Sequence, residues 1–331
     1  MENTIQNAFE RLIQSELTLT STQISRGSTS HNYIRELLSN KNTEDSSFPR
    51  LIDGDFLSGS YARGTKIHPL DDIDVMIIMD GTGLSPISEG VIVDADVRGS
   101  GDSNNPLLAH LGADNRLSSR RVLDLFKLAL QKSHPNSEIK KHGQAINVWL
   151  DSSGMGIDVV PCMHIVPRDG SRDYYYIPMG ENSDQWMTTN PKIDKEISDS
   201  LHEEHNKLFK GFIRLIKYWN KVSNRNRLQS YHLETVAWHT FDSYEGRAFT
   251  YEDALIHFFS EATAQLSISC ADKTGLGGPI DSYLQPLDRQ NSIAEIEKVL
   301  NILREAYHHP QTNEAIRLIA WKMIFGEKFI I

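Results

Sequence analysis

Phe56-Leu-Ser-Gly-Ser-Tyr-Ala-Arg-Gly-Thr-Lys-Ile-His-Pro-Leu-Asp-Asp-Ile-Asp-Val-Met-Ile-Ile-Met79 is the stretch of sequence that decides the fold. Its second half, 72–79, is predicted to be a strand, because its last five residues are apolar without alternation, as in strands covered on both faces. A short strand at 56–57, a turn at 58–60 and one or two helical turns are expected before it. The stretch therefore predicts the interior of a sheet in an α/β fold.

Two carboxylates lie on this predicted strand. Side chains at positions i and i+2 of a strand point to the same face, so Asp72 and Asp74 project together, while Asp71 points away as a capping or salt-bridging residue. Two ionised carboxylates that close repel each other, and a hard cation between them relieves the repulsion. Oxygen ligands suit Mg²⁺, which takes its remaining ligands from water and substrate phosphates. The pattern predicts phosphoryl or nucleotidyl transfer.

A third carboxylate is expected from a neighbouring strand. Asp158 lies inside the short apolar run Gly154-Met-Gly-Ile-Asp-Val-Val-Pro161. Together with the first two carboxylates it could hold two ions, one on an attacking hydroxyl and one on a leaving phosphate. We therefore predict a three-carboxylate metal site.

Gly59 and Ser60 fit the binding of a phosphate. Glycine allows a close backbone approach, and a serine at a helix start offers its amide and hydroxyl to an anion. A Gly-Ser pair alone is a weak signal, but the Asp-Ile-Asp strand that follows makes it a strong one. We leave out Arg63, Lys66 and His68, because charged and turn residues near a motif commonly face solvent.

The remaining N-terminal half is predicted to be mixed. Residues 40–50 form a polar connector and 98–106 are the most loop-like segment of the chain, a candidate mobile insertion near a short apolar run at 91–93. The expected helices are 4–16, 31–38 and one capped by Ser118 and Ser119 that runs to 132. Segments 144–150 and 155–163 are predicted to form a hairpin beside the first strand.

The C-terminal half is predicted to be helical. Residues 174–191 are interpreted as irregular, and apolar residues at helical spacing then predict helices at 194–222, 230–240, 251–266, 292–307 and 313–325. This change suggests three parts: N-terminal helices (1–48) that pack on both other parts, an α/β core (49–191) and a helical domain (192–331).

Composition limits the partners and the compartment. The 331 residues are 39% hydrophobic and 24% charged, which is typical of a globular protein, and the formal net charge is −10. This charge, without a dense basic stripe, argues against an extended nucleic-acid duplex as partner. Two distant cysteines disfavour a disulfide or zinc framework. We expect a cytoplasmic protein without a signal peptide or membrane span.

A Gly-Ser turn, an Asp-x-Asp strand and a separate third Asp resemble the signature of the DNA polymerase β-type nucleotidyltransferase superfamily. Further segments resemble the cGAS/DncV-like enzymes and the related oligoadenylate synthases, and the similarity covers most of residues 50–326. The bacterial members are the better match, because this chain lacks the basic surfaces and zinc insert of nucleic-acid-activated animal members. The segments are Ile157–Pro161, Trp186–Pro191, Arg214–Trp219, Gln229–Glu234 and Ala320–Gly326.

The resemblance implies a fold and a reaction. It implies a polymerase β-type core of a small mixed sheet with a C-terminal helical bundle, and an enzyme that joins NTPs into a cyclic di- or trinucleotide messenger for anti-phage signalling. Lys217 and Ser230 would grip the donor triphosphate, and Tyr231 would stack on a base, a contact worth about 1–3 kcal/mol. Two Mg²⁺ ions, replaceable by Mn²⁺, would serve as cofactors. A regulatory protein and an effector that binds the product are the implied partners.

Three other functions stay open at this point. A linear oligonucleotide synthase or tail polymerase would share the metal site, and an aminoglycoside-type nucleotidyltransferase is disfavoured by the matching helical segments. A non-catalytic nucleotide sensor would normally have lost a carboxylate, whereas this chain has all three.

Overall fold

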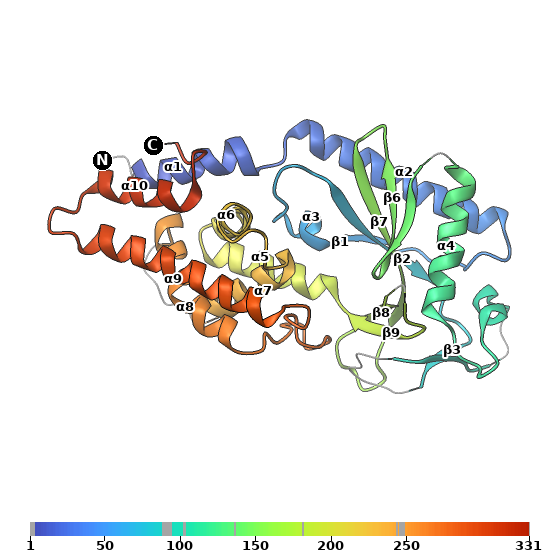
Figure 1. Ribbon diagram of the computed structural model, residues 1–331. Coiled ribbons are helices and arrows are strands. Elements are labelled where there is room, and N and C mark those ends of the chain that lie inside the picture. Colours follow the sequence, from blue (N-terminus) through green and yellow to red (C-terminus); the bar gives the residue numbers. More distant parts are fainter. Residues whose placement is uncertain are drawn as a thin grey trace.

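The computed structural model describes residues 4–87, 95–101, 104–135, 137–180, 182–242, 244 and 249–330. Figure 1 shows two lobes side by side, one built around a sheet and the other made of helices. The predicted apolar run at 91–93 lies outside the described residues, as do residues 102 and 103 of the loop predicted at 98–106.

The sheet has the order β1-β2-β7-β6-β5, and only β2 and β7 of these neighbours run parallel. Strand β8 pairs with the end of β7, and β9 pairs with β8. The strands are β1 (Phe56–Ser58), β2 (Asp72–Met79), β5 (Ile139–His142), β6 (Ala145–Leu150), β7 (Met155–Ile165), β8 (Tyr174–Pro178) and β9 (Trp186–Thr189), with β3 (Leu84–Pro86) and β4 (Val97–Gly99) forming a separate ladder. The predicted strand at 72–79 and the hairpin beside it are confirmed.

The irregular structure predicted for 174–191 is wrong, because this segment contains β8 and β9. Both strands are short, so they carry few residues from which a pattern could be judged. Tertiary contacts hold them: Tyr176 and Trp186 are fully buried, and the indole of Trp186 donates a hydrogen bond to the carbonyl of Leu117 at 2.9 Å.

Two helices cover one face of the sheet. Helices α2 (Ser21–Glu44) and α4 (Ser119–Ser133) pack against β2, β6 and β7, and bury side chains such as Ile73 and Val75. Helix α4 matches its prediction, including the Ser118 cap. Helix α2 is much longer than the predicted 31–38 and replaces part of the expected connector. The longer helix escaped detection because it is mostly polar; a Thr20–Gln23 capping box starts it.

The helical lobe has its own apolar core, which includes Phe212, Trp219 and Trp321. The predicted helix at 194–222 is two helices, because Asn206 and Lys207 adopt positive φ and end the first one. Helix α1 (Thr4–Leu12) and the π-helical turn η1 (Ile13–Leu17) join this core, whereas α2 belongs to the sheet core. The other helices are η2 (Pro106–His110) and α3 (Gly59–Arg63) in the sheet lobe, and α5 (Pro191–Glu204), α6 (Phe209–Val222), α7 (Ser230–Phe241), α8 (Tyr251–Ser267), α9 (Pro286–His308) and α10 (Glu314–Phe325).

In the described residues, no helix combines the length and the apolar character that crossing a membrane requires.

Candidate active site

The sheet brings the three predicted carboxylates to one face. Asp74 lies opposite Asp158 in the parallel pair β2–β7, and Asp72 precedes it by two residues. Ile73 and Val75, which alternate with them, point into the core under α2 and α4. The carboxylates therefore lie on the sheet face that these helices leave free.

Asn147 orients the third carboxylate. It pairs with Asp158 across β6 and β7, and its amide Nδ2 donates to Asp158 Oδ1 at 2.6 Å. A side chain at Gly156 would meet this amide, since an added Cβ would lie 2.7 Å from Nδ2. Asn147 is not among the predicted site residues, although a polar residue in the apolar run Ala145–Leu150 is a usable signal.

Gly59 makes room for Asp74. Its φ is +67°, in the left-handed region, and an added Cβ would lie 1.8 Å from Asp74 Oδ2. Any other residue here would strain the backbone and displace the carboxylate. Gly59, which is predicted to let a phosphate approach the backbone, is thus also required to leave space for Asp74.

Burial and nearby charges raise the pKa values of Asp72 and Asp74. Burial, followed by the charges of Asp158 and Asp72, raises the pKa of Asp74 to about 6. Burial also raises the pKa of Asp72. A bound cation would relieve the repulsion between the acids, and their oxygen atoms are the ligands that Mg²⁺ prefers.

The arrangement is nevertheless incomplete as a metal site. Within the described part of the chain, no three Asp, Glu, His or Cys side chains are grouped so that they could hold a metal ion. Asp72 is engaged elsewhere, because the Lys66 amine binds it and Asp71 together. The expected salt bridge of Asp71 is thereby confirmed.

The raised pKa of Asp74 predicts an unusual pH dependence of stability. Asp74 binds its proton more tightly in the folded state than in the unfolded state, and this difference stabilises the folded state. The stabilisation is fully present below about pH 4 and is lost as the pH rises to about 6. Without divalent cations, Asp74→Asn should therefore raise the free energy of unfolding at pH 7 by about 2 kcal/mol, and by much less at pH 4. Urea unfolding at both pH values checks this; an equal effect at both would contradict it.

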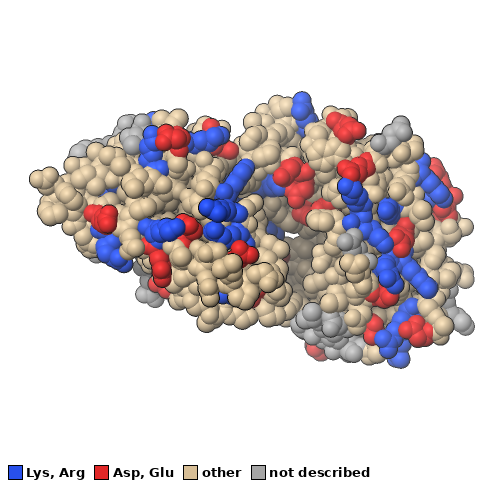
Figure 2. Space-filling view, in the orientation of Figure 1, with Lys and Arg blue, Asp and Glu red and all other residues tan. Residues whose placement is uncertain are grey.

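A cleft of about 550 Å³ lies between the lobes, in front of the carboxylate face. Residues of both lobes line it, among them Gly59, Asp74 and Tyr231 of the predicted site, and Figure 2 shows the molecule hollowed there. Ser60 follows Gly59 in α3, and its carbonyl accepts hydrogen bonds from the amides of Thr65 and Lys66. Ser230 is exposed as the first residue of α7.

Tyr231 lies on the helical wall of the cleft. Its hydroxyl donates to Asp194 Oδ1 at 2.9 Å, and the Arg63 guanidinium carbon lies 5.4 Å from the centre of its ring. Burial, followed by the charges of Asp194 and Asp272, raises the pKa of Tyr231, which keeps the hydroxyl a donor. The ring is therefore held in place from two sides.

Lys217, expected to grip the triphosphate, is buried and is not among the residues that line the cleft. Its amine lies 2.6 Å from Glu234 Oε1 and 3.2 Å from the carbonyl of Thr65, and its side chain is only 5% exposed. Burial lowers the pKa of Lys217, although Glu234 opposes this effect. In this structure a buried carboxylate one helical turn after Ser230 holds the amine, so the contact of Lys217 with a triphosphate stays a prediction.

Arg63, left out as solvent-facing, is also buried. Its Nε and Nη2 donate to Glu234 Oε2 and Oε1 at 3.0 and 3.1 Å, and Thr65 Oγ1 donates to Oε2 at 3.0 Å. Glu234 thus joins the segment after the Gly-Ser turn to helices α6 and α7. Glu234 lies in the segment Gln229–Glu234, and the sequence alone indicates no role for it.

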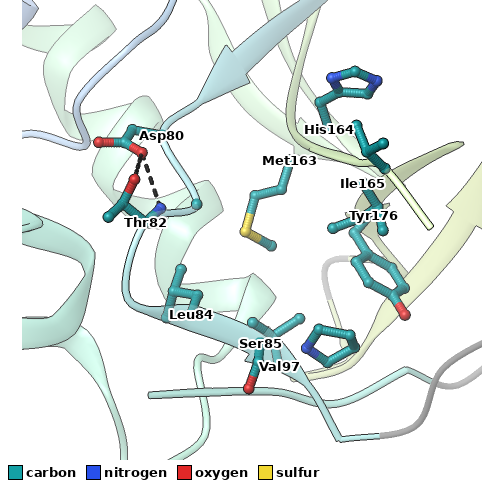
Figure 3. A pocket seen from close by; sticks show the side chains of 12 residues that line it. Asp80, Thr82, Leu84, Ser85, Val97, Met163, His164, Ile165 and Tyr176 are labelled. Carbon is teal, nitrogen blue, oxygen red and sulfur yellow. Dashed lines mark hydrogen bonds between the residues drawn. The ribbon is translucent and has the colours of Figure 1, made fainter. Parts of the chain in front are cut away.

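A second cavity, of about 340 Å³, lies at the opposite end of β2 and β7 (Figure 3). Asp80, Met163 and Tyr176 line it, and Asp80 accepts hydrogen bonds from Thr82. None of the predicted site residues, all of which the structure describes, contributes to it.

Comparison with known proteins agrees with this geometry. The model of the Second Messenger Oligonucleotide or Dinucleotide Synthetase domain matches residues 3–98, which include the Gly-Ser turn and the Asp-x-Asp strand. A probable cyclic nucleotide synthase of Bacillus cereus is 27% identical over 99% of this chain and 98% of its own. A cyclic AMP-AMP-AMP synthase of Escherichia coli is 22% identical over 86% of this chain and 84% of its own.

The fold matches solved structures over the whole chain. Two structures of Escherichia coli CdnC, one with ATP and one in a complex with HORMA-deltaN, superpose with a TM-score of 0.70 at 17% identity. Each alignment covers 100% of this chain. It also covers 100% of the CdnC chain in the structure with ATP and 99% of it in the complex with HORMA-deltaN. The enzyme is a nucleotidyltransferase with a polymerase β-type core. In sequence and in fold the chain is similar to the cGAS/DncV-like nucleotidyltransferases.

Proposed function

We propose that the protein joins nucleoside triphosphates into a cyclic di- or trinucleotide and releases pyrophosphate. The observation that carries this proposal is the shared sheet face of Asp72, Asp74 and Asp158 beside the Gly59 turn. The names of the relatives, which are cyclic nucleotide synthases, support a cyclic product. As the resemblance implies, the product would serve as a second messenger in anti-phage signalling.

The carboxylates have distinct tasks in this proposal. Asp72 and Asp74 would hold two Mg²⁺ ions, which Mn²⁺ could replace, and Asp158 would share the ion nearest the incoming hydroxyl. Such ions supply charge stabilisation at the attacking and leaving oxygens. Asp158, held by Asn147, helps to accept the proton of the hydroxyl.

The donor triphosphate would lie against α3 and the start of α7. Ser60 offers its amide and hydroxyl from the Gly-Ser turn, and exposed Ser230 offers the same groups from the N-terminus of α7. Tyr231 would stack on a base. Lys217 would have to leave Glu234 to touch a phosphate, so in the arrangement seen here it contributes charge from below the cleft.

The partners of CdnC suggest those of this chain. Its structures contain ATP in one case and HORMA-deltaN in the other. We propose NTPs as substrates here, a regulatory protein as activator and a product-binding effector downstream. An extended duplex is not expected to be an activator, because the net charge is −10.

One incubation tests the proposed reaction. The protein is incubated with all four NTPs and Mg²⁺ or Mn²⁺, the products are treated with phosphatase, and the survivors are identified by mass spectrometry. A cyclic oligonucleotide survives phosphatase and supports the proposal. Products that lose their terminal phosphates identify a linear synthase, and NTP binding by calorimetry without any product identifies a sensor.

Replacing Gly59 should separate backbone strain from displacement of Asp74. Gly59→Ala introduces a Cβ 1.8 Å from Asp74 Oδ2, so we expect at least about a 100-fold loss of transfer, as a 1 Å misplacement at an active site can cause. Gly64→Ala is the matched control, because φ is +71° and the nearest contact is an ordinary 3.6 Å. Each should lose about 1–2 kcal/mol of stability. Equal activity losses would refute the role of Gly59.

A further inference from the structure

Lys66 binds Asp72, the carboxylate that a complete metal site would need. Its amine contacts Asp72 and Asp71 at once, and its side chain is only 14% exposed, against 46% for Asp72 and 64% for Asp71. Its backbone amide donates to the carbonyl of Ser60 at 3.1 Å. The lysine is therefore anchored to the same turn that we assign to the triphosphate.

This contact accounts for the incomplete metal site. The ammonium group lies on Asp72 Oδ1, and a divalent cation bound to the same carboxylate would be repelled by this charge in a partly buried setting. Asp74 and Asp158 lie opposite each other across β2 and β7, and among the described residues no three Asp, Glu, His or Cys side chains are grouped to hold a metal ion. Binding of a cation to all three acids is thus opposed for as long as the amine stays on Asp72.

The two acids differ in a way that allows this movement. Asp72 shares the sheet face of Asp74, whereas Asp71 lies just before β2 and is largely exposed. An amine that leaves Asp72 can stay on Asp71, so its charge remains compensated. Asp71 is thus the alternative partner that makes the exchange possible.

We propose that Lys66 is an exchangeable internal counter-ion: it neutralises Asp72 while no metal is bound and moves to Asp71 when a divalent cation takes Asp72. This inference rests on the proposed function, because it assumes that Asp72, Asp74 and Asp158 bind the cation. It makes Lys66 a positioning residue that lowers metal affinity. A cation then occupies the site only at concentrations high enough to displace the amine.

Mn²⁺ binding to the full chain tests the proposal without any measurement of activity. Free Mn²⁺ is followed by electron paramagnetic resonance while the protein is titrated. Lys66→Met keeps an unbranched side chain that is only one atom shorter and removes the charge. We expect this variant to bind Mn²⁺ at least about tenfold more tightly, a change equivalent to about 1.4 kcal/mol. Lys141→Met is the matched control, because Lys141 and its partner Asp124 are similarly exposed, at 22% and 51%.

Two further arms separate direct exchange from a general field effect. The gain of Lys66→Met over wild type should persist at 0.5 M KCl, because a contact is screened far less than a distant charge. Asp71→Asn should weaken Mn²⁺ binding, since the amine then has only Asp72. When Asp71→Asn is combined with Lys66→Met, it should weaken Mn²⁺ binding by a clearly smaller factor, because the amine is absent.

The outcomes distinguish this inference from the proposed function. Equal Mn²⁺ affinities of wild type, Lys66→Met and Lys141→Met would overturn the inference alone, as would a gain that vanishes at high salt. Unchanged Mn²⁺ binding in Asp74→Asn with Asp158→Asn would overturn the metal site itself. Thermal unfolding of each variant shows that it is folded at the titration temperature.

Discussion

Asp72→Asn combined with Asp74→Asn is expected to abolish nucleotidyl transfer while the protein stays folded. The double change removes two of the three acids that share the sheet face. Charge stabilisation by bound metal is worth several kcal/mol, and about 4 kcal/mol corresponds to a loss of about 10³-fold in rate. Pyrophosphate release from mixed NTPs with Mg²⁺ measures the effect.

The control for this prediction carries the same change in charge away from the cleft. Asp124→Asn with Asp199→Asn alters two partly exposed acids that pair with lysines outside the cleft lining. It should keep transfer within about twofold of wild type, because surface ion pairs contribute little. Undiminished turnover in the Asp72 and Asp74 variant would refute the mechanism, and a fall in its unfolding temperature at pH 7 would contradict the raised pKa of Asp74.

The local part of the site could be predicted from the sequence because its determinants lie within short segments. The apolar runs that hold Asp74 and Asp158 predict two buried strands, and buried strands of one lobe commonly pair. The positive φ of Gly59 agrees with a glycine in the turn that starts a helix. These features depend on the strand period and on turn chemistry, both of which are visible without a structure.

The remaining part depends on contacts between distant segments. Lys217 lies on the helix predicted for it, but its amine faces Glu234 because α6 and α7 pack together, and no local pattern sets the rotation of one helix against another. Arg63 is 171 residues from the carboxylate that holds it. A charged residue next to a turn is usually exposed, so its burial could be recognised only in the folded chain.

Glu234→Ala is expected to cost about 3–5 kcal/mol of folding stability, the usual effect of breaking a buried ion pair by removing one partner. Burial alone would raise the pKa of Glu234, but Arg63 and Lys217 outweigh it and hold that pKa at about 2. The stabilisation is therefore present above about pH 4.5 and is lost as the pH falls towards 2. Removing the carboxylate leaves two buried cations, so urea unfolding at pH 7 should show the full loss of stability. Glu196→Ala is the control, because it breaks an exposed ion pair with Arg172. It should cost under about 1 kcal/mol. Similar losses in both variants would mean that the buried cluster does not hold the lobes together.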